Sequence, residues 1–262
     1  MTTSKTSNFS FKHSGALGDL IYSLPIVKHF GGGQFYLHLN QMDWIGKHYY
    51  GALPTPFHQG RMTQTDFEYM RDFMEAQDYI DLFGPLESQG ITHNLDRFRP
   101  VFVGHPTNYI DIYSSVFGIS DPDTQKAIRT TPWLTVPSTL RLQDRDVVVN
   151  RTQRWIPNQP SPQWAEWKNQ GIEERAVFVG LPAEYAAFQT AVGWDIPYQP
   201  TSNMLQLAQY IAGADLYIGN QSQGLALAIG LGVGQICCEA RTDMPLERNE
   251  CFFPDNPRIV YF

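Results

Sequence analysis

The sequence predicts an α/β protein with two Rossmann-like domains, and three observations lead to this fold class. Short apolar runs alternate along the chain with longer segments of helical spacing, which is the rhythm of strand–helix–strand units in parallel sheets. This rhythm occurs in residues 8–118 and again in residues 146–239. Between them, residues 130–146 are polar, contain prolines and lack periodicity, which is typical of a linker. Two such series joined by a linker predict domains that face each other across a cleft.

The first half contains three predicted strands and three predicted helices. The strands are the alternating or apolar segments 8–13, 34–40 and 100–105. The helices are an apolar series from Ile21 to Phe30, the segment 64–80 and the segment 106–118. Pro25 interrupts the first series, so that helix either kinks at the proline or begins later with Ser23 as its cap.

The second half repeats the pattern. Its predicted strands are 146–150, 175–180, 215–220 and 235–239. Ser202 is the expected cap of a helix whose apolar face includes Met204 and Leu207, and a short helix within "GLALAIGLG" ends at glycine.

Composition excludes several classes of protein. Of 262 residues, 42% are hydrophobic and 17% charged, which indicates a globular chain. The net charge of −7 argues against broad binding to a phosphate backbone, although a local basic groove stays possible. No apolar run approaches the ~18 residues of a membrane span, and the amino terminus lacks an apolar signal core. Three cysteines form no disulfide framework, so a cytoplasmic location is expected.

The domain boundaries follow from the linker. We expect an amino-terminal domain over residues 1–138 and a carboxyl-terminal domain over residues 139–246. We expect residues 247–262 to pack back toward the first domain, because their apolar side chains need cover.

Polar loops follow the strands of the second half, and parallel sheets bind ligands at the carboxyl ends of their strands. Arginines beside helix-start amides suit a diphosphate, and Glu184 or Glu239 suits hydrogen bonds from a ribose diol. The donor-binding candidates are Arg151, Thr152, Arg154, Gly180, Glu184, Asn220, Gln221, Ser222, Gln223 and Glu239. Plainer interpretations stay open: the arginines are solvated surface charges, and the glycines only shape turns.

The stretch "HSGALGDLIYSLP", residues 13–25, carries an acid directly after a strand and a glycine turn. A dinucleotide site of Rossmann type would instead have Gly-x-Gly-x-x-Gly there. Asp19 is therefore a candidate to accept a proton from a hydroxyl group. The alternative is that Asp19 is only a helix N-cap, a common position for aspartate.

Two stretches resemble the ADP-heptose–lipopolysaccharide heptosyltransferases, glycosyltransferase family nine. "SGALGDLIYSLPIVKHF" resembles the amino-terminal motif of that family, in which a strand leads into Gly-Asp, five residues and Pro. "LAQYIAGADLYIGNQSQGLALAIGLGVGQI" resembles its carboxyl-terminal motif. The likeness covers both ends of the chain and is diffuse in the middle.

This resemblance implies GT-B architecture, with the acceptor on the first domain and a nucleotide-sugar mainly on the second. It implies an inverting hexosyl- or heptosyltransferase that needs neither metal nor cofactor, with Asp19 as the general base. The expected acceptor-binding residues are Gly15, Gly18, His38 and His105.

The sequence departs from the family at two positions, with Gln221 in place of an acid and Ala226 in place of a histidine. Arg151 or Arg154 stands in for the lysine of the family. Three hypotheses follow: a glycosyltransferase acting on a glycan or another hydroxylated acceptor, a phage-type enzyme that glycosylates a hydroxymethylated base in DNA, and a catalytically inactive nucleotide-sugar binding protein. The second requires a basic groove in the first domain.

Overall fold

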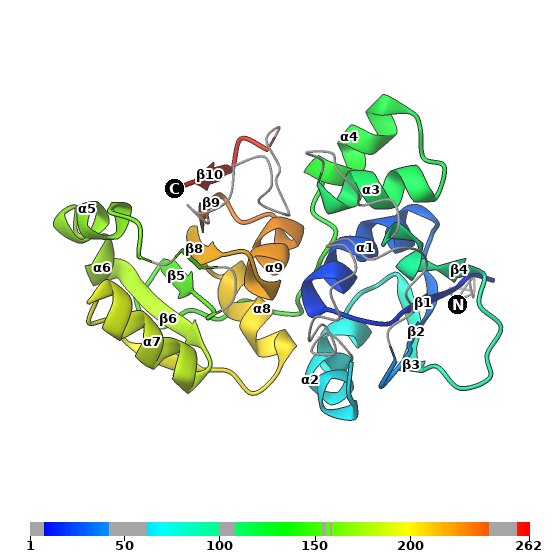
Figure 1. Cartoon of the computed structure of the whole chain (residues 1–262), viewed down its shortest axis with the longest axis horizontal. Helices are drawn as coiled ribbons and strands as arrows, with labels where there is room; N and C mark the ends of the chain where they lie inside the picture. The colour runs from blue at the N-terminus through cyan, green and yellow to red at the C-terminus, as the bar shows by residue number, and fades with distance from the viewer. Residues whose placement is uncertain (1–7, 42–61, 100–107, 154–155, 158, 241–255) are drawn as a thin grey trace, which may run out of the picture. The chain divides into compact units, whose positions relative to one another are not determined.

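The computed structural model describes residues 8–41, 62–99, 108–153, 156–157, 159–240 and 256–262. The chain divides into two compact units, Met1–Thr135 and Val136–Phe262, each built on its own parallel sheet (Figure 1). The predicted fold class is confirmed, because every described strand pair is parallel and helices connect the strands. The division falls within the predicted linker, where no helix or strand lies between Thr130 and Val147.

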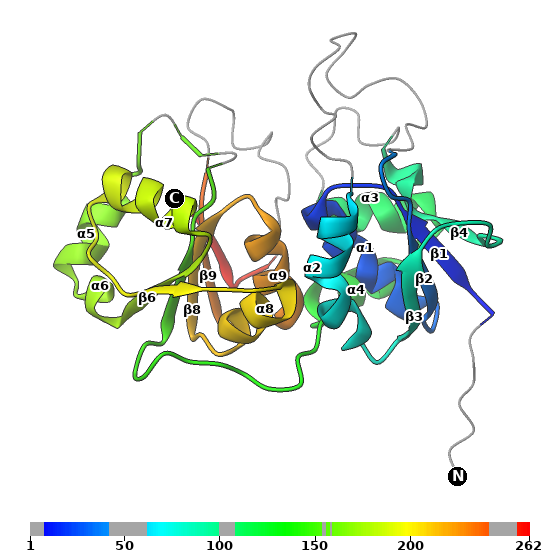
Figure 2. The ribbon, with the colours of Figure 1, turned by 90° about the horizontal axis from the view of Figure 1, so that it is seen from below.

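The first unit has a four-stranded sheet of order β3-β2-β1-β4. Its strands are β1 (Ser10–His13), β2 (Gly33–Leu37), β3 (Ile80–Pro85) and β4 (His93–Asn94). Its helices are α1 (Leu17–His29), α2 (Gln64–Glu75), the short 3-10 helix η2 (Leu95–Phe98), α3 (Tyr109–Val116) and α4 (Pro122–Thr130). Figure 2 shows α1 and α2 on the same face of the sheet, as right-handed crossovers from β1 to β2 to β3 require.

Helix α1 begins earlier than the proline suggests. It starts at Leu17 and contains Pro25, so Ser23 is not its cap. Proline has no N–H to give to the carbonyl one turn earlier, that of Ile21. The indole N–H of Trp133 donates to this Ile21 oxygen at 3.3 Å, which supplies the missing partner.

Helix α2 ends at Glu75, five residues before the predicted end. The side-chain amide of Gln77 donates to Phe73 O at 2.7 Å and to Thr135 O at 3.1 Å, and the chain then enters β3. The sequence did not predict β3, and the predicted strand 100–105 lies outside the described residues.

The second unit has a six-stranded sheet of order β10-β9-β8-β5-β6-β7. Its strands are β5 (Val147–Asn150), β6 (Ala176–Gly180), β7 (Tyr198–Pro200), β8 (Leu216–Asn220), β9 (Gln235–Glu239) and β10 (Ile259–Tyr261). The chain runs outward from β5 through β6 to β7 and then returns to β8 on the other side of β5. The strand order therefore reverses between β5 and β8, where doubly wound sheets bind their ligands.

Five helices connect these strands: α5 (Gln163–Asn169), α6 (Ile172–Arg175), α7 (Pro182–Val192), α8 (Met204–Ala212) and α9 (Gln223–Leu231). The cap of α8 is Asn203 rather than Ser202, because Asn203 Oδ1 accepts from Gln206 N at 2.9 Å. The core includes Trp164, Trp194 and Phe178, all buried.

The described end of the carboxyl-terminal segment belongs to the second unit and not to the first. Strand β10 pairs with β9, and the ring of Phe262 packs edge-on against Trp164 and Trp167. Ile259, Tyr261 and Phe262 thus find partial cover in the second unit, whereas Val260 is 49% exposed. Residues 247–255 lie outside the described residues. Among the helices that the structure describes, none is long and apolar enough to span a membrane.

Candidate functional site

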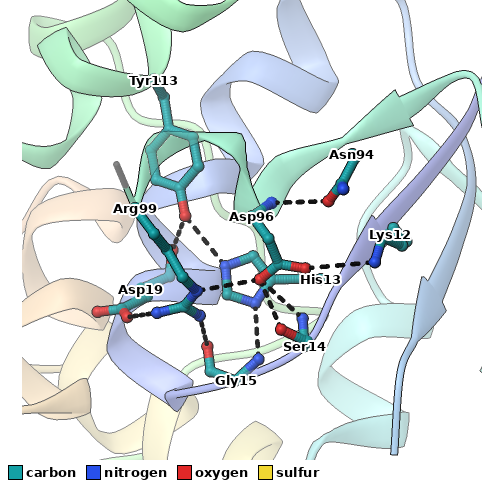
Figure 3. Close-up of polar contacts among 9 residues, drawn as sticks. All are labelled: Lys12, His13, Ser14, Gly15, Asp19, Asn94, Asp96, Arg99 and Tyr113. Atoms are coloured by element: carbon teal, nitrogen blue, oxygen red, sulfur yellow. Dashed lines mark hydrogen bonds and ion pairs between the residues drawn. The ribbon is translucent and has the colours of Figure 1, made fainter. Parts of the chain in front are cut away.

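A strained turn joins β1 to α1 at the carboxyl end of the first sheet. Ala16, the N-cap residue of α1, has φ 49° and ψ 121° and makes no side-chain cap. Such a conformation in a non-glycine residue costs on the order of 1–3 kcal/mol and persists only where its surroundings hold it. Polar side chains from the η2 region and from α3 contact this turn and its two flanking elements (Figure 3).

Asp19 lies in the first turn of α1, so it is not the N-cap of this helix. A carboxylate is favourable there because the helix dipole is positive at its amino end. Arg99, the residue after η2, holds Asp19 through Nη1–Oδ2 at 3.4 Å and holds Gly15 through Nη2–O at 3.2 Å. The Asp19 side chain is 18% exposed and that of Arg99 8%, so the carboxylate is the more accessible partner.

The Asp96 carboxylate binds both the turn and Arg99. Its side chain is fully buried and accepts hydrogen bonds from Ser14 Oγ at 2.7 Å, Ser14 N at 3.2 Å and Arg99 Nε at 3.3 Å. Lys12 Nζ lies 3.7 Å from its other oxygen. Two cations and two carboxylates therefore alternate from Lys12 through Asp96 and Arg99 to Asp19, which compensates the buried charge.

His13 supports the same turn as a neutral ring. Its Nδ1 accepts from Gly15 N at 3.2 Å, so its Nε2 carries the proton toward Tyr113 Oη at 3.0 Å, and Tyr113 Oη donates to the Asp19 carbonyl at 3.1 Å. The pKa of His13 is lowered to about 3, chiefly by burial, which the charges of Arg99 and Lys12 reinforce and that of Asp96 opposes. His13 is therefore a structural support at neutral pH.

The structure brings most of the predicted acceptor residues to this end of the sheet. Gly15 and Gly18 flank the turn, and His38 follows β2, where its amide donates to His13 O at 2.9 Å. Burial and the charge of Lys12 lower the pKa of His38. His105 lies outside the described residues.

In the second unit, two predicted donor residues form a buried ion pair. Arg151 follows β5 and Glu239 ends β9, and Arg151 Nε lies 2.5 Å from Glu239 Oε2, with the two side chains 3% and 0% exposed. The other Glu239 oxygen accepts from Trp164 Nε1 at 2.9 Å and Ser161 N at 3.2 Å. In the structure their charged ends pair with each other and join β5 to β9, and their expected roles toward diphosphate and ribose stay predictions. Arg154 lies outside the described residues.

The amino end of α9 lies against the end of β5. A Cβ on Gly224 would fall 2.1 Å from Asn150 Oδ1 and 2.6 Å from Tyr217 Oη, so only glycine fits at this point. Ser222, the N-cap residue of α9, makes no side-chain cap hydrogen bond. The first-turn amides of α9 are thus at the strand-order reversal without a serine cap, an arrangement that suits an anion.

The remaining predicted donor residues surround this helix end. Asn220 Oδ1 accepts from Thr152 N at 2.9 Å, which ties β8 to the loop after β5. Gln221, beside Asn220, is buried, and Gln223 opens α9. After β6, Gly180 lies close to Glu184 and Asn150, because a Cβ there would be 3.1 Å from Glu184 Oε2 and 3.0 Å from Asn150 Nδ2. Burial raises the pKa of Glu184.

Sequence reasoning missed Asp96, Arg99, Tyr113 and Asn150. The basic groove that a DNA glycosyltransferase would need in the first domain would have to draw on scattered basic residues, and Arg99 and Lys12 are two of these. Both are committed to ion pairs in the buried cluster. Asn150 is the last residue of a buried strand, a position from which side chains commonly serve a site.

No acidic or histidine cluster that could hold a metal occurs among the described residues. Two Asp-x-Asp sequences occur, at residues 121–123 and 144–146, and one aspartate of each has a structural role. Asp121 caps α4 by accepting from Thr124 N at 2.8 Å, and Asp146 pairs with Arg175.

No protein-family model and no curated protein matches the sequence. Solved structures do match in fold. The chain is similar to a glycosyl transferase of family 9 from Veillonella parvula, with a TM-score of 0.62 and 12% identity over 97% of this chain and 85% of that one. The chain has the fold of that glycosyltransferase.

Two Escherichia coli proteins extend this likeness. Heptosyltransferase WaaC with ADP matches with a TM-score of 0.55 and 10% identity, over 97% of this chain and 92% of that chain. The dodecameric iron-containing heptosyltransferase TibC in complex with ADP-D-β-D-heptose matches with a TM-score of 0.54 and 14% identity, over 96% of this chain and 62% of that chain. The predicted GT-B fold is thereby confirmed.

Proposed function

We propose that the chain is an inverting, metal-independent glycosyltransferase that moves a sugar from a nucleotide-sugar to a hydroxyl group. The observation that carries the proposal is the position of Asp19. Its carboxylate is partly exposed, lies at the first turn of α1 and is held 3.4 Å from Arg99, on a fold that family-nine glycosyltransferases share. Fold alone fixes no chemistry, so the proposal depends on this carboxylate.

Asp19 acts as the general base in this reaction. It takes the proton of the acceptor hydroxyl as the acceptor oxygen bonds to the anomeric carbon. The bond from that carbon to the diphosphate oxygen breaks on the opposite face, and the electron pair leaves with the nucleoside diphosphate. One displacement of this kind inverts the anomeric configuration, and Gly15, Gly18 and His38 lie where the acceptor would bind.

The donor binds on the second unit, where the strand order reverses between β5 and β8. Its diphosphate lies at the amino end of α9, beside Thr152, Asn220, Gln221, Ser222 and Gln223, because the first-turn N–H groups and the helix dipole favour an anion.

Two side chains complete the donor site in this proposal. Glu184, whose side chain lies beside Gly180, accepts from the ribose diol. Arg154 supplies the cation after β5, a role that Arg151 cannot fill while it is buried against Glu239.

A turnover assay tests the proposal. The purified protein is incubated with ADP-, UDP-, GDP-, CMP- and dTDP-sugars in turn, and release of the free nucleotide, a nucleoside diphosphate or, from a CMP-sugar, CMP, is measured with and without EDTA. We expect one donor class to be consumed at equal rates in both conditions. Donor binding in a thermal-shift assay without any turnover would instead identify an inactive binding protein, and loss of turnover in EDTA would contradict metal independence.

A further inference from the structure

We propose that Arg99 is the positioning residue of the general base: supported by Asp96, it fixes the orientation of Asp19 and keeps its carboxylate charged. This inference rests on the proposed function and adds a residue to it. The contact between Arg99 and Asp19 joins residues that are 80 positions apart in the sequence. Arg99 directly follows η2, which itself follows the short strand β4.

The guanidinium of Arg99 makes three directed contacts that a simpler cation could not make. Its Nε donates to Asp96 Oδ1 at 3.3 Å, its Nη2 to Gly15 O at 3.2 Å and its Nη1 to Asp19 Oδ2 at 3.4 Å. A planar fork with donors at fixed angles therefore ties the base to the turn before it and to a buried anchor. Lysine has one nitrogen and would satisfy one of these contacts at a time.

Asp96 fixes Arg99 in turn. The anchor carboxylate is fully buried and receives two hydrogen bonds from Ser14, so it cannot turn toward solvent. The ring of Phe98 lies 4.8 Å from the guanidinium carbon of Arg99 and covers one of its faces. Arg99 is thus held in place before any substrate binds, which is the condition for a preorganised base.

Among the described residues near Asp19, Arg99 is a charged partner in direct contact with its carboxylate. From β1, His13 is neutral because burial lowers its pKa to about 3. From α3, Tyr113 is neutral because burial raises its pKa, and its hydroxyl contacts the Asp19 carbonyl rather than the carboxylate. Asp96 is the second carboxylate of the cluster, and Lys12 lies on the side of Asp96 away from Arg99. Removing Arg99 therefore removes the attraction that favours the charged form of Asp19.

The test compares Arg99→Gln with the wild-type full chain by following the Asp19 carboxyl carbon in a pH titration by NMR, with Asp19→Asn to assign the signal. We expect Asp19 to titrate about one to two pH units higher in Arg99→Gln, as loss of an adjacent cation requires. The matched control is Arg129→Gln, which removes a pair with Asp111 at 3.1 Å that joins α4 to α3. This control should leave the Asp19 titration unchanged.

Kinetics then separate positioning from a purely structural role. With donor and acceptor saturating at neutral pH, kcat of Arg99→Gln should fall about ten- to hundred-fold, less than the loss on removing the base itself. The acid limb of its kcat–pH profile should move to higher pH together with the NMR titration, while KM for the donor stays unchanged. Arg99→Lys retains the charge, so its acid limb should stay near that of the wild type while kcat falls.

A double variant keeps the inference testable if Arg99→Gln fails to fold. Arg99→Gln leaves Asp96 with less compensation, whereas Asp96→Asn/Arg99→Gln removes a buried anion and cation together. The double variant should still show an upward shift of the Asp19 titration, smaller than that of Arg99→Gln because the negative charge of Asp96 is also lost. An unchanged Asp19 titration in either folded variant would overturn the inference, whereas a wild-type protein without turnover would reject the proposed function while leaving the titration measurable.

Discussion

Replacing Arg151 with methionine should lower the free energy of unfolding of the protein and leave its affinity for the nucleotide-sugar donor unchanged. The guanidinium is 3% exposed and lies 2.5 Å from the Glu239 carboxylate, which is fully buried. Methionine keeps much of the length of arginine but leaves the Glu239 charge uncompensated. Removing one partner of a buried pair costs about 3–5 kcal/mol, a large share of the ~5–15 kcal/mol of a typical folded protein.

Urea unfolding followed by tryptophan fluorescence measures this loss, because Trp164 donates to Glu239 and reports on the same region. Arg175→Met is the matched control, since Arg175 pairs with Asp146 in the same unit but is 51% exposed. An exposed pair contributes about 0–1 kcal/mol, so this control should unfold close to the wild type. The double variant Arg151→Met/Glu239→Gln should recover part of the loss, because it removes both charges.

The opposite pattern would show that Arg151 serves the donor and not the stability of the second unit. Arg151→Met would then be as stable as Arg175→Met, and its affinity for the donor would fall. In that case Arg151 would contact the diphosphate, and the buried pair would not describe the working protein.

Two further predictions concern the turn of the first unit and the helix end of the second. The lowered pKa of His13, about 3 against 6.5 when unfolded, means that unfolding takes up a proton between these values. As the pH is lowered from 7 to 5, the free energy of unfolding should therefore fall by about 2 kcal/mol more in the wild type than in His13→Gln. Urea unfolding at the two pH values measures this difference. Equal falls in the two proteins would mean that His13 is charged in the folded state. Gly224→Ala puts a Cβ 2.1 Å from Asn150 Oδ1 and should cost about 1–3 kcal/mol and weaken donor binding, while Gly90→Ala, with open space around it, should change neither. Unaltered stability and donor affinity in Gly224→Ala would show that α9 need not approach β5 so closely.

The fold could be predicted because apolar runs and helical spacing are local properties of the sequence. Strands β5, β6, β8 and β9 of the second unit lie where their short apolar runs predict them. The start of α1 could not be predicted, because it depends on a positive φ at Ala16 and on an indole from Trp133 that satisfies the carbonyl freed by Pro25. Short β4 has two residues and no periodicity that a sequence could reveal.

The site could be predicted at the level of strand ends and not at the level of partners. Asp19 follows directly from its motif, but Arg99 reaches it from 80 residues away through the placement of η2. Arg151 and Glu239 were both expected at strand ends, and both are there. Whether they turn toward a ligand or toward each other depends on the pairing of β5 with β8 and of β8 with β9. This pairing brings together two residues that are 88 positions apart in the sequence.

The most direct test of the central claim is the rate of glycosyl transfer by Asp19→Asn, measured beside its affinity for the donor. Asparagine keeps the size of aspartate and cannot accept the proton, so we expect near-normal folding and donor binding with transfer lowered about 10²–10⁴-fold. Transfer at the wild-type rate by a folded Asp19→Asn would mean that another group takes the proton and that Asp19 is not the general base.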